Sequence, residues 1–383
     1  HSFPTRRSSD LWSQTYDREP SEVISIQEDI AADIATAMKT AMDPGALREM
    51  VQVGTRSVEA YNAFLKSIAL EREAAFSGRF SIQAVIDELQ RAREIDPTFA
   101  EAHYRLAQSY RDAAATSRMD FADAVSGEEA WTLAISSIRD AVRAAGASPA
   151  RLKYEAFDAA MHLDFELARD RLLTYLETRP NDLEAWQDLR NLGQMMFDAA
   201  LVRQASDELL RIAPQDPYVV WNVGAQMLLT GLITEGADIL DRALSLDPRN
   251  EEVQYQAHRG FLWAGRYAEA ARLEAGLLSG GLGPRFKTIV RLRSACRAGD
   301  RDAAEAATPE ASEPWERWYA QTLLGNQEAA TRILAPLDRT AAGRDDLANY
   351  LVYPFFDPSP FPNLSAQLER AGVQRPAPVP IPF

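Results

Sequence analysis

The chain has 383 residues, of which 46% are hydrophobic, and a formal net charge of −15 at pH 7. This length and hydrophobic share suffice for a large core, and the acidic balance argues against nucleic acid as a partner of this region, since phosphate binding requires a positive surface. A single cysteine, Cys296, excludes an intrachain disulfide, and no apolar run approaches the ~18 residues that a membrane span needs.

Residues 1–11 differ in character from the rest of the chain. The segment HSFPTRRSSDL resembles the translation of a sequencing-adapter oligonucleotide, and a disordered basic tail is the alternative. On the adapter interpretation, the natural protein begins further upstream. Arg6 and Arg7 would then carry no targeting or DNA-binding signal.

Residues 12–43 combine a short strand with one amphipathic helix. Trp12 and Tyr16 suit a strand, and Ser21 suits the start of a helix. Apolar residues then recur every three or four positions, at Val23, Ile26, Ile30, Ile34 and Met38. A lone helix of this kind requires a sheet or a bundle to cover it, and no such partner precedes it in this sequence.

Residues 44–57 contain Pro44, Gly45 and Gly54 and are predicted to form a linker. Helical patterns follow one another from residue 58 onwards. The first helical pair is predicted at 58–76 and 80–95.

A fixed period of 34 residues organises the middle of the chain, and two residue types carry it. The prolines are Pro180, Pro214 and Pro248, and the glycines are Gly231, Gly265 and Gly299. Each proline disfavours helix in the residue before it, and each glycine can close a helix because it adopts positive φ at little cost. The period therefore predicts one pair of antiparallel helices in every 34 residues.

Within the unit 217–248, the apolar positions fall on helical stripes. Those on one face of the first helix are Val220, Val223, Gly224 and Met227. Small residues such as Gly224 and Gly236 let neighbouring helices approach closely. One pair cannot bury its apolar face alone, so neighbouring pairs supply the core by stacking. We therefore predict an array of about eight helical pairs over residues 58–340.

The second pair of the array is longer than the others. Pro97 and Gly146, the equivalents of the later prolines, are 49 residues apart, which is 15 more than one period. The surplus falls within residues 116–127, as an insertion between the helices or an extension of them. Insertions in such arrays lie on one face, and this one is either a plain loop or a binding element.

Residues 341–383 are predicted to form a C-terminal cap and a proline-rich tail. Phe355, Phe356 and Phe361 are expected to cover the apolar end of the last pair, since arrays of this kind need a terminal cap. The tail at 376–383 (PAPVPIPF) is of the polyproline type, and it either packs back on the array or extends freely.

Two resemblances follow from these patterns. A 34-residue helical pair closed by proline resembles the tetratricopeptide (TPR) repeat. At 11–35, LW-S-x-x-YDR followed by I-Q-x-x-IA-x-x-IA resembles the C-terminal end of a TolB-like (FlgO-like) α/β domain, which precedes TPR repeats in many bacterial proteins. The segment AREIDPTFAEAHYRLAQSY (92–110) is similar to the first TPR units of those proteins. The predicted fold class is therefore all-α: a TPR-type α-α superhelix, or solenoid, with a short remnant of an upstream α/β domain.

This resemblance implies an effector domain upstream of the sequence. In such proteins the upstream domain is a CadC-like winged-helix transcriptional domain, an adenylate/guanylate cyclase or a protein kinase. Their catalytic or DNA-binding residues would lie before residue 1, so none of them is transferred to this chain.

No catalytic constellation stands out among the residues present. His103 and His258 fall in separate repeats, without cysteine or carboxylate at metal-ligand spacing, and Cys296 has no evident base beside it. The glycine-rich stretch 279–284 lacks the lysine and the Ser/Thr that a phosphate-binding loop needs. We therefore predict no catalytic, cofactor-binding or metal site, and no enzyme.

The TPR resemblance implies which side chains line the concave groove, because certain positions of each first helix face it. The residues predicted in this way to bind a peptide or protein are Gln187, Asn191, Trp221, Tyr255, Arg259, Trp263, Arg293 and Arg297. Aromatic side chains beside arginines offer a large contact area and directed hydrogen bonds. The alternative is that the tryptophans pack between turns of the superhelix or against the C-terminal cap.

These observations favour a non-enzymatic interaction module, the sensor or scaffold part of a truncated bacterial regulatory protein. It would bind a protein or peptide segment, or its own upstream effector domain, and no nucleic acid. The alternatives are the regulatory C-terminal region of an adenylate/guanylate cyclase or protein kinase, and that of a CadC-like winged-helix regulator. We expect a cytoplasmic location, or a periplasmic one if a membrane span precedes this sequence.

Overall fold

The computed structural model describes residues 50–51, 53–77, 82–115, 127–308, 314–373 and 376–379. Within these ranges the regular secondary structure is helical, without a strand. The predicted adapter-derived segment (1–11), the predicted TolB-like remnant (12–43) and nearly all of the predicted insertion lie outside the described residues.

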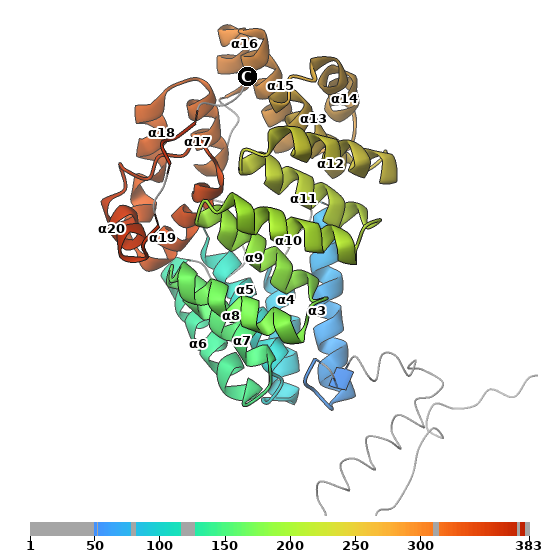
Figure 1. The fold of residues 1–383 in the computed structure, drawn as a ribbon, viewed down its shortest axis with the longest axis vertical. Coiled ribbons are helices and arrows are strands. Elements are labelled where there is room, and N and C mark those ends of the chain that lie inside the picture. Colours follow the sequence, from blue (N-terminus) through green and yellow to red (C-terminus); the bar gives the residue numbers. More distant parts are fainter. Residues whose placement is uncertain are drawn as a thin grey trace, which may run out of the picture.

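The described part of 58–334 forms eight consecutive pairs of helices, which stack in chain order (Figure 1). The helices are α3 (Val58–Ser77), α4 (Ile82–Ile95), α5 (Ala100–Ala114), α6 (Gly127–Ala145), α7 (Ala150–Met161), α8 (Phe165–Thr178), α9 (Leu183–Met195), α10 (Ala199–Ile212), α11 (Pro217–Leu229), α12 (Ile233–Leu246), α13 (Glu251–Trp263), α14 (Tyr267–Ser279), α15 (Pro284–Ala298), α16 (Arg301–Ala307), α17 (Pro314–Leu323) and α18 (Gln327–Leu334). The predicted all-α, TPR-type superhelix is confirmed for the residues that the structure describes, and the predicted α/β remnant lies outside them.

The 34-residue period also places the caps that begin the helices. The first helices α9, α11 and α13 are preceded by Asp182, Asp216 and Asn250, whose side chains accept hydrogen bonds from backbone N–H groups of the first turn. Aspartates one period apart, Asp164 and Asp198, cap the second helices α8 and α10 in the same way. Because helix N-termini leave N–H groups unpaired, each such cap stabilises its helix by about 1 kcal/mol.

The turn between the two helices of a pair has a left-handed residue at one repeated position. Gly231, Gly265 and Gly299 have φ of 83°, 73° and 69°, which confirms the prediction that these glycines end helices. Leu163 and Phe197 stand at the same position of earlier pairs and also adopt positive φ, of 57° and 58°. The stacked helices therefore impose this turn even where glycine is absent, at a cost that a side chain normally avoids.

Small residues allow the closest approach between helices of one pair. Gly224 of α11 and Gly236 of α12 face each other, and a Cβ added to Gly224 would lie 2.9 Å from the carbonyl oxygen of Gly236. A Cβ on Gly236 would lie 2.8 Å from the carbonyl oxygen of Gly224. The contact is backbone to backbone, so no side-chain rearrangement could accommodate a methyl group there.

After α18 the chain turns back along the array instead of ending on it. We call residues 335–370 the closing segment, which consists of η4 (Ala335–Arg339), α19 (Ala341–Ala348), η5 (Asn349–Val352) and α20 (Pro362–Arg370). In Figure 1 this segment descends at the left of the array and reaches α6, and α19 contacts α5 and α6 while η5 contacts α9. The segment thus joins the end of the array to its second pair.

Polar contacts fix the closing segment to these distant helices. Arg111 of α5 donates two hydrogen bonds to the carboxylate of Asp345, at 2.8 and 2.7 Å, across 234 positions of sequence. The backbone N–H of Ala342 donates to Oε1 of Glu128 at 3.1 Å. The apolar side chain of Ala342 belongs to the core of residues 50–161. The closing segment, which contains most of the predicted cap, therefore also contacts the second pair of the array.

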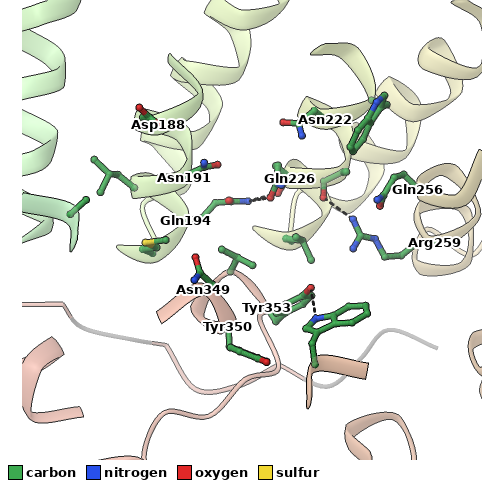
Figure 2. Close-up of a pocket in the computed structure, with 18 of the residues that line it drawn as sticks. Asp188, Asn191, Gln194, Asn222, Gln226, Gln256, Arg259, Asn349, Tyr350 and Tyr353 are labelled. Atoms are coloured by element: carbon green, nitrogen blue, oxygen red, sulfur yellow. Dashed lines mark hydrogen bonds between the residues drawn. The ribbon is translucent and has the colours of Figure 1, made fainter. Parts of the chain in front are cut away.

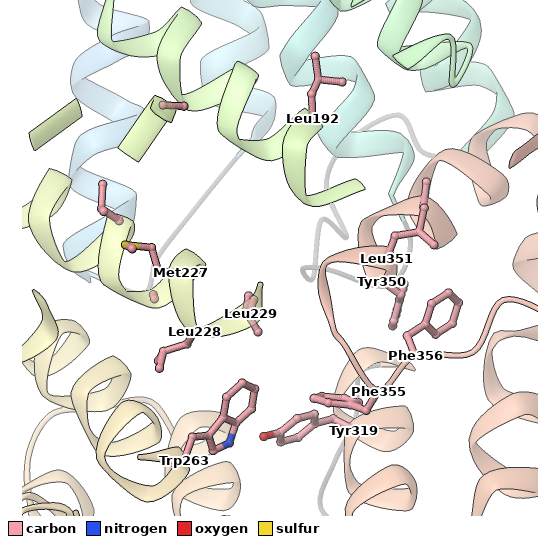
Figure 3. Packing of buried hydrophobic residues seen from close by; sticks show 14 of the residues in the cluster. Leu192, Met227, Leu228, Leu229, Trp263, Tyr319, Tyr350, Leu351, Phe355 and Phe356 are labelled. Carbon is pink, nitrogen blue, oxygen red and sulfur yellow. The ribbon is translucent and has the colours of Figure 1, made fainter. Parts of the chain in front are cut away.

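Aromatic side chains of the closing segment and α17 form the core beneath it. Phe355, Phe356 and Phe361 are buried, with at most 6% of each side chain exposed. Trp318 is the centre of this cluster, with ring centroids at 4.8 Å from Tyr350, 5.9 Å from Phe355 and 6.0 Å from Phe356. Figure 3 shows Phe355 near Trp263 at the end of α13, with Leu228 and Leu229 of α11 on the same side. The three phenylalanines are buried against apolar side chains. Phe355 contacts Trp263 of α13 as well as Trp318 of α17, so the covered surface is not that of the last pair alone.

The glycine contact gives a direct test of the packing. We expect Gly224→Ala to lower the free energy of unfolding by about 1–3 kcal/mol, because its Cβ has no room. Gly276→Ala is the matched control: Gly276 lies in α14 with no atom within 4 Å of an added Cβ, so alanine should stabilise by up to about 1 kcal/mol. Urea denaturation of the two variants measures this, and equal effects would contradict the packing described.

Candidate binding pocket

A cavity of about 460 Å³ lies between the first helices of consecutive pairs and the closing segment (Figure 2). One wall consists mainly of residues on α9, α11, α13 and α15, with a few from α5, α7 and α8. The facing wall consists of Trp315, Asn349, Tyr350, Val352 and Tyr353. We call this cavity the inter-repeat pocket. Its volume lies within the range of small-molecule sites, roughly 300–1,000 Å³.

The repeat period brings equivalent positions into the inter-repeat pocket. One series, 34 residues apart, is Asp188, Asn222 and Gln256, and another is Asn191, Ala225, Arg259 and Arg293. Because each first helix repeats the orientation of the one before it, positions one period apart line the same surface in succession. Apart from Ala225, the lining is therefore polar along two parallel series of positions.

Five of the eight predicted binding residues line the pocket and three do not. Those in the lining are Asn191, Trp221, Tyr255, Arg259 and Arg293. Those outside it are Gln187, Trp263 and Arg297. Gln187 is half-buried, and Arg297 lies over the ring of Tyr267, with its guanidinium carbon 3.3 Å from the ring centroid.

Trp263 is buried where the groove interpretation expects it exposed. Only 5% of it is accessible, and its ring meets that of Phe355 edge to face, with centroids 6.2 Å apart (Figure 3). For Trp263 the structure therefore agrees with the alternative interpretation, in which the tryptophans pack against the C-terminal cap. Its physical reason is that the closing segment needs apolar surface beneath its own aromatic side chains.

Two buried arginines occupy one end of the pocket. Arg293 is 1% exposed and donates to the hydroxyls of Tyr319 at 3.3 Å and Tyr255 at 3.1 Å. Arg259 is 7% exposed and donates to the carbonyl of Ala225 at 3.4 Å. Burial lowers the pKa of Arg259, and the positive charge of Arg293 lowers it further. The two cations therefore repel each other in a poorly solvated place.

Side-chain amides occupy the middle of the pocket, and most of them were not among the predicted residues. Gln194 donates to the backbone carbonyl and to Oε1 of Gln226, both at 2.9 Å, and Asn222 and Gln256 come from the next two helices (Figure 2). Asn349 faces them from the closing segment. The recurrence of a polar residue at 188, 222 and 256 is a sequence signal that could have identified part of this set.

A charged network lies next to the inter-repeat pocket, where α5, α7 and α9 meet. Asp188 of this network lines the inter-repeat pocket, whereas Lys153 and Glu184 line a second cavity. Lys153 is buried and contacts Oε2 of Glu184 at 2.6 Å, and Arg105 contacts the same oxygen at 3.1 Å. Burial alone would raise the pKa of Glu184, but the charges of Arg105 and Lys153 lower it to about 2. Burial raises the pKa of Asp188 to about 7, and the negative charge of Glu184 contributes in the same direction. The two carboxylates thus differ in protonation near neutral pH.

Three other features bear on the chemistry of the described ranges. Within them, no group of three or more His, Cys, Asp or Glu residues is placed to hold a metal ion. Cys296 is a free, half-buried thiol whose pKa is raised by burial, which disfavours the reactive thiolate. Among the helices described, none combines the length and the apolar character that crossing a membrane requires.

Comparisons with known proteins give matches among solved structures alone. The sequence matches neither a known protein family nor a curated protein. Among solved structures it is similar to PilF from Pseudomonas aeruginosa, with 16% identity, 72% of this chain and 99% of that chain covered, and a TM-score of 0.30. It is also similar to the TPR domain of P58(IPK), with 12% identity, 80% and 92% covered, and a TM-score of 0.24. At these scores neither structure bears on the ligand.

The raised pKa of Asp188 predicts a pH-dependent stability. The folded chain holds a proton on Asp188 up to about pH 7, whereas a free aspartate loses it near pH 4, so this group lowers stability as the pH rises between these values. We expect Asp188→Asn to raise the free energy of unfolding at pH 8 by on the order of 1–3 kcal/mol, and to gain progressively less towards pH 4.

Urea denaturation at several pH values measures this gain. Asp238→Asn, which removes a side chain that is 70% exposed, controls for the change in net charge. A gain for Asp188→Asn that is the same at pH 4.5 and pH 8 would contradict the assignment.

Proposed function

We propose that the chain is a non-enzymatic recognition module that binds a short protein segment in the inter-repeat pocket. The observation that carries this proposal is the convergence of side-chain amides from three successive first helices and the closing segment on one cavity. An amide side chain has both a donor and an acceptor, which is the pair that each peptide unit of a backbone presents. The aromatic side chains of Trp221, Tyr255 and Tyr353 add contact area beside them.

Two physical properties favour binding by this surface. The amide-bearing helices are already packed by their neighbours, so little conformational freedom is lost on binding. The volume of about 460 Å³ limits the bound part to a few residues. A longer ligand would have to displace residues 349–353, which cover the pocket from the other side.

The wider context of the module is part of the same proposal. We place it as the sensor or scaffold part of a bacterial regulatory protein, with residues 12–43 as the end of a TolB-like domain, 44–57 as a linker, 58–340 as the TPR array and 341–383 as cap and tail. The upstream effector would be a cyclase, a kinase or a CadC-like winged-helix domain. The module would work in the cytoplasm, or in the periplasm behind an upstream membrane span. Sequencing the upstream reading frame from source DNA distinguishes these alternatives.

Selection from a displayed library of random hexapeptides on the full 383-residue chain tests the binding proposal. We expect enriched peptides to bind in fluorescence polarisation, and the double variant Asn222→Ala/Gln256→Ala to raise their Kd by about tenfold or more, because two hydrogen-bonding amides of the pocket are lost. Gln254→Ala is the control, since Gln254 is an amide of the same helix α13 outside the pocket. No enrichment, or an equal loss with the control, would refute peptide binding in the pocket.

A further inference from the structure

The arginine end of the inter-repeat pocket contains more positive charge and more hydrogen-bond donors than the described residues satisfy. Three arginines line the pocket, and Arg111 is neutralised by Asp345. Arg259 and Arg293 form no ion pair with a carboxylate in the part of the chain that the structure describes, and their recorded hydrogen-bond acceptors are a carbonyl and two phenol oxygens. Both side chains are more than nine-tenths buried.

Donor atoms without a hydrogen-bond partner lie at this arginine end of the pocket and beside it. Nε of Arg259 and Nη1 of Arg293 are buried and have no hydrogen-bond partner within the described residues. Nε1 of Trp263, whose ring lies 5.6 Å from the guanidinium carbon of Arg259, is also buried and unpartnered. Buried polar groups are normally paired, so a surplus of donors without acceptors indicates an acceptor that enters from outside.

The geometry restricts the kind of acceptor. The rings of Tyr255 and Tyr319 flank the guanidinium of Arg293, with centroids 4.6 and 5.7 Å from its central carbon. Aromatic rings therefore lie close to this guanidinium. Its Nε and Nη2 already donate to the two hydroxyls, and Nη1 is the group left for binding. The planar edge of a guanidinium matches a planar carboxylate, with two parallel N–H···O bonds.

We propose that the inter-repeat pocket binds a carboxylate group between Arg259 and Arg293. Arg259 points into the pocket next to Gln256 and opposite Tyr353 (Figure 2). The carboxylate neutralises the two adjacent cations and accepts hydrogen bonds from their unpartnered N–H groups. The neighbouring amides and aromatic rings hold the rest of the molecule.

The carboxylate has two potential sources. It belongs either to a free small organic acid or to the acidic side chain or C-terminus of a peptide. With the first source the inference stands apart from the proposed function, and with the second it rests on that function. Experiments with small acids and with peptides separate the two.

The first experiment uses the full chain and the sodium salts of acetate, succinate, benzoate and phosphate at constant ionic strength. We expect at least one carboxylate to raise the melting temperature with a saturable dependence on concentration, and Arg259→Met and Arg293→Met each to weaken its binding at least tenfold. Arg301→Met is the control, because the side chain of Arg301 is 61% exposed. Tighter binding of phosphate than of every carboxylate would overturn the proposed ligand class.

A second measurement does not depend on the folding of these variants. In the wild-type chain with ¹⁵N-labelled arginine, the Nε–H resonances of the two buried arginines should shift when the binding carboxylate is added, while those of exposed arginines stay in place. Arg259→Lys, which keeps the charge but loses the planar fork, should bind more weakly than wild type. Absence of any shift of these resonances with the three carboxylates and with the selected hexapeptides of the third experiment would overturn the proposal.

The third experiment compares hexapeptides selected on the chain with forms in which Asp and Glu are replaced by Asn and Gln and the C-terminus is amidated. At least a tenfold loss on neutralisation supports the peptide source. Binding of small acids without any peptide supports the carboxylate site while the proposed peptide function fails. Peptides that bind equally well after neutralisation, with no binding of small acids, overturn the carboxylate site and leave the peptide function intact.

Discussion

A bidentate ion pair between Arg111 and Asp345 holds together two parts of the chain that lie 234 residues apart. A stack of helical hairpins makes contacts chiefly between neighbours, so its two ends need not meet. Here the closing segment crosses from the last pair to α5 and α6, and Ala342 enters the core of the first pairs. The carboxylate of Asp345 is only 5% exposed. Removing Arg111 would therefore leave a buried, unpaired charge and destabilise the fold.

The inter-repeat pocket is a consequence of that closure. The inner surface of the array alone would present Asp188, Asn222 and Gln256 to solvent as a polar series. Asn349, Tyr350, Val352 and Tyr353 lie opposite this series and complete the pocket. Polar groups that are buried there interact more strongly than they would in water. Arg259 and Arg293 line the pocket together with residues of this segment, so a segment distant in sequence completes the site.

The sequence predicted the features that depend on local physics and missed those that depend on distant partners. The 34-residue period identified the helical pairs and the left-handed glycines, because apolar spacing and turn residues are local properties. Leu163 and Phe197 adopt the same turn without a local signal. Five of the eight predicted binding residues line the pocket. Trp263 instead packs against Phe355, and the repeat period cannot predict a contact with a residue that lies outside the repeats.

A double-mutant cycle on Arg111 and Asp345 tests closure most directly. The free energies of unfolding of Arg111→Met, Asp345→Asn and the double variant are measured in urea and compared with that of the unmodified chain. Closure predicts a coupling energy of about 2 kcal/mol or more, since the pair is bidentate and largely buried. Additive effects, with a coupling below about 0.5 kcal/mol, would show that the closing segment does not reach α5 in solution.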